Sequence, residues 1–173
     1  MILRPAAKAD LPAVCAIYDC AHDMEEQGSW TTGWIRGIYP ERDIAEESLA
    51  EGSLYVAEVD GEIAATARIN QIQGDEYGQG RWSEDVPPEQ VLVLHTMIVL
   101  PEYQRHGVAQ FIVGEYAEMA RERGCTWLRL DTNEINLPAR ALYKKLGFTE
   151  IGVALGDFCG LPDIHLVLLE KKL

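Results

Sequence analysis

Residues 99–109 read Val-Leu-Pro-Glu-Tyr-Gln-Arg-His-Gly-Val-Ala, and this stretch decides the fold. The run before it, 91–99, is apolar on both alternating faces, which is typical of a central strand covered on both sides. Pro101 ends that strand, because proline cannot donate a hydrogen bond to the ladder. A tight turn then leads directly into a helix predicted over 107–123, with Gly124 just beyond its end.

The turn has the features of an anion-binding site. The first amides of the helix have no partner within it, and the helix dipole places partial positive charge there. Gly107 and the small Ala109 let an anion approach the backbone, and Arg105 adds a positive side chain. A diphosphate suits such a site. The alternative is an ordinary strand-to-helix turn with an incidental glycine. GxGxxG and GxxxxGK[ST] motifs are absent, which argues against nucleotide-dependent dehydrogenases and NTPases.

The rest of the chain alternates strands and helices. We expect strands at 1–4, 54–59, 62–70 and 127–130, with one or two more within 148–169, and helices from Asp10, as N-cap, to about Gln27, at 41–51 and at 139–146. Asp60-Gly61 predicts a hairpin between two of these strands. The fold class is therefore α/β (mixed α+β), with a central mixed sheet of about six to seven strands and helices on both faces.

Composition limits the partners. The 173 residues suit a single domain over 1–173. With 28 acidic and 15 basic side chains the net charge is −13, which argues against nucleic-acid and anionic-membrane partners. No apolar run is long enough to cross a bilayer, and no signal peptide is recognisable. The four cysteines form no CxxC pair, so we expect reduced thiols and a cytoplasmic protein.

A second group of residues follows some thirty positions downstream. Asn136 either caps the short helix after it or binds a ligand. Tyr143, one turn into that helix, is either a packing residue or a general acid, since a positioned phenol can protonate a departing thiolate.

The two patterns together carry a family resemblance. V-x-P-x-x-Q-x-x-G-x-A at 99–109, followed by N-x-x-A-x-x-L-Y-x-x-x-G-F at 136–148, resembles the GCN5-related N-acetyltransferases, the GNAT family. The resemblance covers nearly the whole chain. It departs from the family pattern at Ala109, which replaces a glycine, and at Gln104, which replaces an arginine. It implies the GNAT fold, with a mostly antiparallel sheet, and acetyl-CoA bound in a cleft between two splayed central strands.

The resemblance also implies roles for individual residues. The backbone of Met97, Ile98 and Val99 would pair with the pantetheine arm. The pyrophosphate would be held by the amides of Gln104, Arg105, His106, Gly107, Val108, Ala109 and Gln110. Asn136 would bind the cofactor arm, and Tyr143 would protonate the coenzyme A sulfur. The acceptor amine would attack the thioester directly, with the oxyanion stabilised by a backbone amide of the strand.

The base and the acceptor site have several candidates. His95 and Asp131 are both placed to take a proton from the amine, but each is also explained as a structural histidine or a strand-end carboxylate. Glu25, Trp34 and Tyr39 combine acidic and aromatic side chains that suit a cationic amine, although they are also explained as a solvated face and core. The polar segment 74–89 is predicted to cover the acceptor site and to be mobile before binding.

We therefore expect an N-acetyltransferase that uses acetyl-CoA and a small cationic or amino-acid-like amine as acceptor. The alternatives are a protein amino-group acetyltransferase, a non-catalytic acetyl-CoA sensor, and an enzyme that uses another donor such as succinyl- or propionyl-CoA. A metal enzyme is set aside, because the four histidines are scattered and no metal-ligand pair is recognisable. The sequence does not determine the oligomeric state; dimers are common in the family the chain resembles, and an edge strand near the C-terminus is a candidate contact for a homodimer.

Overall fold

The computed structural model describes residues 1–173 and contains one seven-stranded sheet in the order β1-β2-β3-β4-β5-β7-β6. The strands are β1 (Ile2–Pro5), β2 (Leu54–Val59), β3 (Glu62–Asn70), β4 (Val91–Val99), β5 (Trp127–Asn133), β6 (Thr149–Phe158) and β7 (Leu161–Lys172). The helices are α1 (Leu11–Glu26), α2 (Arg42–Ala50), α3 (Val108–Glu122) and α4 (Leu137–Lys145). All strand pairs are antiparallel except β4 and β5. The predicted α/β fold with a mixed sheet is confirmed.

The predicted elements are present, with shifted ends. β5 runs on to Asn133 instead of ending at 130, because β7 pairs with it along its whole length. α4 begins two residues earlier than predicted, because Asn136 is its N-cap and accepts from the Ala139 amide at 3.4 Å. Asp10 is the N-cap residue of α1, as predicted, but its side chain makes no capping hydrogen bond. Its carboxylate instead accepts from the Ala7 amide at 2.7 Å and pairs with Arg4 at 2.6 Å.

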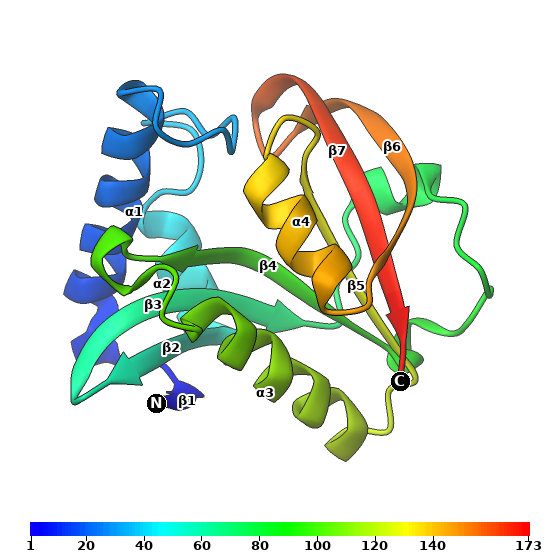
Figure 1. Cartoon of the computed structure of the whole chain (residues 1–173), viewed down its shortest axis with the longest axis horizontal. Coiled ribbons are helices and arrows are strands. Elements are labelled where there is room, and N and C mark those ends of the chain that lie inside the picture. Colours follow the sequence, from blue (N-terminus) through cyan, green and yellow to red (C-terminus); the bar gives the residue numbers. More distant parts are fainter.

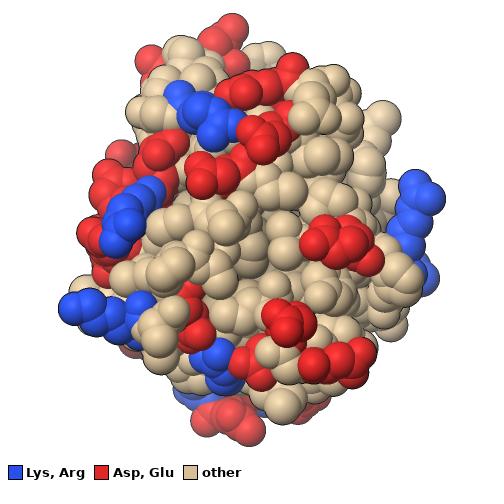
Figure 2. Space-filling view, turned by 90° about the vertical axis from the view of Figure 1, so that its left-hand side faces the viewer, with Lys and Arg blue, Asp and Glu red and all other residues tan.

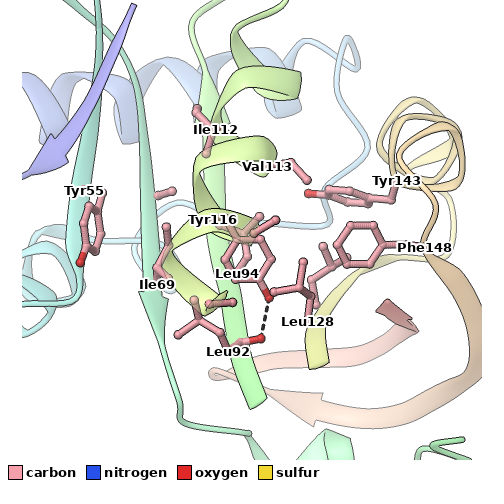
Figure 3. Packing of buried hydrophobic residues seen from close by; sticks show 14 of the residues in the cluster. Tyr55, Ile69, Leu92, Leu94, Ile112, Val113, Tyr116, Leu128, Tyr143 and Phe148 are labelled. Atoms are coloured by element: carbon pink, nitrogen blue, oxygen red, sulfur yellow. Dashed lines mark hydrogen bonds between the residues drawn. The ribbon is translucent and has the colours of Figure 1, made fainter. Parts of the chain in front are cut away.

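The helices cover both faces of the sheet (Figure 1). Along β2, Leu54 and Val56 pack in a cluster with α1 and α2, while Tyr55 and Ala57 pack in the larger cluster with α3. This alternation follows the two-residue period of a strand. Within the larger cluster the hydroxyl of Tyr116 donates to the Leu92 carbonyl and ties α3 to β4 (Figure 3).

The sheet splits between β4 and β5, and this split positions the site. Their parallel pairing runs from Val91–Trp127 to Leu94–Leu130 and then ends. Beyond that point β4 stays paired with β3 and β5 with β7, so the two strands diverge (Figure 1). Thr96 has φ +48° beside a register shift against β3, which marks a bulge at the point of divergence. Residues 97–99 therefore have no strand partner on the β5 side.

Acidic side chains dominate the face on which α1 lies, with few Lys and Arg between them (Figure 2). No helix in the structure combines the length and the apolar character needed to cross a membrane.

Candidate functional site

A cavity of about 170 Å³ lies where β4 and β5 separate. It is lined by residues from both halves of the sheet, from α4 and from four connecting segments: Thr32, Trp34, Tyr39, Glu76, Leu94, His95, Thr96, Met97, Asp131, Thr132, Asn133, Asn136, Ala139, Tyr143, Phe158, Cys159, Leu161, Ile164 and Leu166. Seven of the predicted site residues are among them: Met97, His95, Asp131, Asn136, Tyr143, Trp34 and Tyr39. Glu25 is not, and neither are Ile98, Val99 and residues 104–110.

The turn before α3 has the geometry of an anion site. Gly107 is the N-cap of α3 in the left-handed conformation, with φ +84°, and Arg105 is also left-handed at φ +63°. Gln104 donates to the Val99 carbonyl at 3.1 Å and so holds the turn against the end of β4. Gln104, Arg105, His106, Gly107 and Gln110 are exposed, Ala109 is half-buried, and only Val108 is buried. A Cβ at Gly107 would meet nothing within 4 Å, so the space beside the first amides is open.

Tyr143 lines the cavity from α4. The side chain is only 6% exposed and packs edge-on against Phe148, with 5.9 Å between ring centroids. In Figure 3 its hydroxyl points away from Phe148. Burial, and then the charge of Asp131, raise the pKa of Tyr143, so the phenol stays protonated at neutral pH. Asn136 also borders the cavity, but its side chain is already bonded to the Ala139 amide and to Thr132.

Asp131 lies at the far end of β5, beyond the last pair with β4. Its carboxylate accepts from the Tyr77 hydroxyl at 3.0 Å. Burial, and then the charge of Glu76, raise the pKa of Asp131 to about 7. Burial also raises the pKa of Glu76, which the sequence analysis did not single out. The only signal for it was its place in the polar segment 74–89, where a carboxylate is unremarkable.

His95 is bonded to neighbouring backbone and side chains. Its Nε2 lies 3.0 Å from Asn70 Oδ1 and 3.2 Å from the Ile72 carbonyl. Burial, and then the charge of Arg68, lower the pKa of His95 to about 4. The imidazole is therefore uncharged at neutral pH and links β4 to the end of β3.

The loop between α1 and α2 crosses the mouth of the cavity; we name its residues 30–39 the acceptor strap. Thr31 donates to the Ile135 carbonyl at 3.1 Å on one side of the split sheet, and Tyr39 is bonded to Thr96 on the other. Trp34 packs edge-on against Tyr39 at 6.0 Å. Glu25 holds the strap from α1 without reaching the cavity, because its carboxylate accepts from the Thr32 amide, the Thr32 hydroxyl and the Gly33 amide at 2.8–2.9 Å.

The segment 74–89 is packed on the sheet through aromatic residues. Tyr77 is buried against Val91, Val93 and Trp127, and Trp82 stacks on it at 5.3 Å. Of this segment, Glu76 alone lines the cavity. No group of three or more His, Cys, Asp or Glu side chains is arranged to hold a metal ion, and all four cysteines are free.

The split mixed sheet, the exposed turn before α3 and the tyrosine in the cavity lining define an α/β protein with one candidate site, and a match to a known family identifies its class. The model described as "Acetyltransferase (GNAT) family" matches residues 16–148. The chain belongs to this family.

Individual curated proteins match only part of the chain, at moderate sequence identity. The chain is 37% identical over 68 residues to thialysine N-epsilon-acetyltransferase of Bos taurus, covering 39% of this chain and 40% of that protein. It is 28% identical over 122 residues to streptothricin acetyltransferase of Streptomyces lavendulae, covering 70% and 53%. The chain thus spans about half or less of the length of these curated relatives.

Solved structures share the fold. An acetyltransferase of the GNAT family from Streptococcus agalactiae superposes with a TM-score of 0.81 at 20% identity, covering 99% of this chain and 95% of that one. The yncA protein of Salmonella typhimurium, solved with its cofactor acetyl-CoA, superposes at 0.67 with 17% identity, covering 99% and 92%. These likenesses confirm the predicted GNAT fold.

Proposed function

We propose that this protein transfers the acetyl group of acetyl-CoA to a small cationic amine, with both substrates bound at once. The observation that carries the proposal is the divergence of β4 and β5 after the Leu94–Leu130 pair. It leaves an unpaired strand edge at 97–99, which leads along the chain into the exposed turn at 104–110, while Met97 and Tyr143 both line the cavity. Family membership and the structural neighbour that binds acetyl-CoA support the same conclusion.

The residues fit acetyl-CoA as a co-substrate. The free edge of 97–99 offers backbone groups to the amides of the pantetheine arm, as an added strand would. The first amides of α3 hold the pyrophosphate, since they carry partial positive charge and lie beside open space at Gly107. This local geometry explains how a protein with a net charge of −13 binds a polyanion.

Asp131 is the better of the two candidates for the base. A group with a pKa of about 7 is ionised in half of the molecules at neutral pH and is still basic enough to take a proton from an amine. His95, with a pKa of about 4, is a much weaker base, and its Nε2 is already bonded to Asn70.

Proton and electron movements then balance. Asp131 takes a proton from the ammonium form of the acceptor, and the free amine attacks the thioester carbonyl carbon to form the new C–N bond. A backbone amide of β4 near the Thr96 bulge stabilises the oxyanion. The tetrahedral intermediate then collapses: the C–S bond breaks, and Tyr143 donates its proton to the departing sulfur. The nitrogen loses its second proton, which restores the Tyr143 hydroxyl, and Asp131 releases the first proton to solvent. The products are the acetylated amine and coenzyme A.

The cavity favours a small acceptor over a protein chain. It measures about 170 Å³, and the acceptor strap crosses its mouth. The relatives named for thialysine and streptothricin support an amine acceptor. The free cysteines support a reducing compartment, so we place the activity in the cytoplasm.

Thiol release tests the proposal. The protein is incubated with acetyl-CoA and a panel of small amines, and free coenzyme A is measured against a no-amine control. Amine-dependent release supports it. Acetyl-CoA binding without release for any amine or peptide amino terminus would indicate a non-catalytic sensor instead.

A further inference from the structure

The geometry points to Glu76 as a specificity residue that selects acceptors with a second positive charge, namely diamines and amino compounds that carry another ammonium group. The inference rests on the proposed function and narrows its acceptor class.

Contacts within the chain fix Glu76 beside the cavity. Tyr77, the next residue, is 3% exposed and donates to Asp131, which draws the 3₁₀ turn Asp75–Gln79 to the end of β5. Trp82 donates to the Tyr77 carbonyl at 2.9 Å, and Arg129 stacks on Trp82 at 4.0 Å. The Glu76 position is thus set by packed aromatic residues.

Gly74 makes room for the Glu76 carboxylate. A Cβ at Gly74 would lie 2.3 Å from both carboxylate oxygens, so the end of the Glu76 side chain would have to move away. The backbone of Gly74 has φ −67°, a conformation open to any residue, so an alanine here would shift the carboxylate without straining the backbone.

The charges of the cavity require a cation. Glu76 and Asp131 are its two carboxylates, and no Lys or Arg lines it. His95 is uncharged at neutral pH, and Arg68, whose charge reaches it, is paired with Glu51 at 2.8 Å. When the reacting amine gives its proton to Asp131, the amine loses its positive charge and Asp131 becomes neutral. Glu76 is half-buried and lies in no salt bridge, so its charge would then stay unbalanced unless the acceptor supplies a second cation.

Two further features of the cavity indicate a bound ligand. Tyr143, whose side chain is only 6% exposed, lines it together with Asp131, and burial and the charge of Asp131 raise the pKa of its phenol. Trp34, Tyr39 and Phe158 add aromatic faces to the wall. Such faces attract the ammonium groups and alkyl chain of a diamine.

The experiment compares cadaverine with pentylamine, which has the same carbon chain and one amine fewer. Thiol release at saturating acetyl-CoA gives kcat/KM for each amine, and calorimetry on protein saturated with coenzyme A gives each Kd. The variants are Glu76→Gln, Gly74→Ala, and Glu62→Gln as a control with the same chemical change at an exposed position of β3.

We expect wild type and Glu62→Gln to prefer cadaverine by about tenfold or more, the usual effect of one charge-assisted hydrogen bond. Glu76→Gln should remove this preference while pentylamine stays within about twofold, and Gly74→Ala should reduce it by displacing the carboxylate. Equal use of both amines by wild type, or equal losses for both in Glu76→Gln, would overturn the inference.

The calorimetric Kd values test the selectivity of Glu76 independently of the proposed acetyl transfer. Tighter binding of cadaverine that is lost in Glu76→Gln, without thiol release, would contradict acetyl transfer but support the selectivity. Release with pentylamine as fast as with cadaverine would contradict the selectivity and leave the transfer intact. Failure of both amines to bind would overturn the selectivity.

Discussion

The hydroxyl of Tyr77 donates a 3.0 Å hydrogen bond to the carboxylate of Asp131, 54 positions away in the chain. This contact brings the 3₁₀ turn Asp75–Gln79, which includes Glu76, to the end of β5. Burial and the neighbouring charge of Glu76 then raise the pKa of Asp131 to about 7. A carboxylate in this state is suited to take a proton from an amine near neutral pH.

Asp131→Asn should lower kcat/KM on the order of a hundredfold or more, because the amide cannot take the proton. In wild type, kcat/KM should rise with pH through about 7 as Asp131 ionises, and this inflection should be absent from the variant. Asp60→Asn, the same change in the β2–β3 turn, serves as control, because asparagine suits its left-handed backbone. An inflection near pH 7 that survives in Asp131→Asn would assign the base elsewhere.

Asp131→Asn should also have a higher melting temperature than wild type at high pH. The pKa of Asp131 is raised from 3.8 to about 7, so the folded protein retains a proton that the unfolded chain releases. The stabilisation from protonated Asp131 is complete below about pH 4 and is lost as the pH rises through about 7. The asparagine side chain of the variant resembles the protonated carboxyl and still accepts from Tyr77. We expect a gain in Tm on the order of 5 °C at pH 8 and a smaller gain at pH 5.5. Equal Tm differences at both pH values would contradict the raised pKa.

Tyr143→Phe should lower kcat on the order of a hundredfold while leaving the Kd for acetyl-CoA within about twofold. The change removes the proton donor and keeps the ring that packs on Phe148. Tyr18→Phe, at a position of α1 that is 3% exposed and outside the cavity, tests the effect of losing a buried hydroxyl. Matching losses in kcat and in acetyl-CoA affinity would show that Tyr143 is a packing or binding residue.

Gly107→Val should weaken acetyl-CoA binding by about tenfold or more, since the side chain would fill the open space beside the first amides of α3. A left-handed backbone also strains any β-branched residue by about 1–2 kcal/mol. Gly124→Val shares that strain, with φ +74° and no atom within 4 Å, but lies at the other end of α3. Unchanged acetyl-CoA affinity in Gly107→Val would place the pyrophosphate elsewhere.

Local patterns in the sequence were sufficient to predict the elements of the fold. Proline after the apolar run of β4, glycine before α3 and Asp60-Gly61 each act within a few residues, so their structural effects are readable from the chain alone. The ends of β5 and α4 were misjudged, because pairing with β7 and the capping contact of Asn136 decided them.

Long-range contacts decide the rest of the site. Glu76 reaches the cavity because Tyr77 contacts Asp131, and no local pattern encodes that contact. Glu25 was predicted to bind substrate as an acidic group near aromatics. Its carboxylate instead holds the acceptor strap, which depends on how residues 32 and 33 fold back over α1.

Binding of acetyl-CoA at the split between β4 and β5 is the central claim, and calorimetric titration of the whole chain tests it most directly. Acetyl-CoA and desulfo-coenzyme A share the pyrophosphate and the pantetheine arm, whereas ATP lacks that arm. We predict saturable binding of acetyl-CoA and desulfo-coenzyme A with one site per chain, and no comparable binding of ATP. Absence of acetyl-CoA binding by the folded protein would contradict the account.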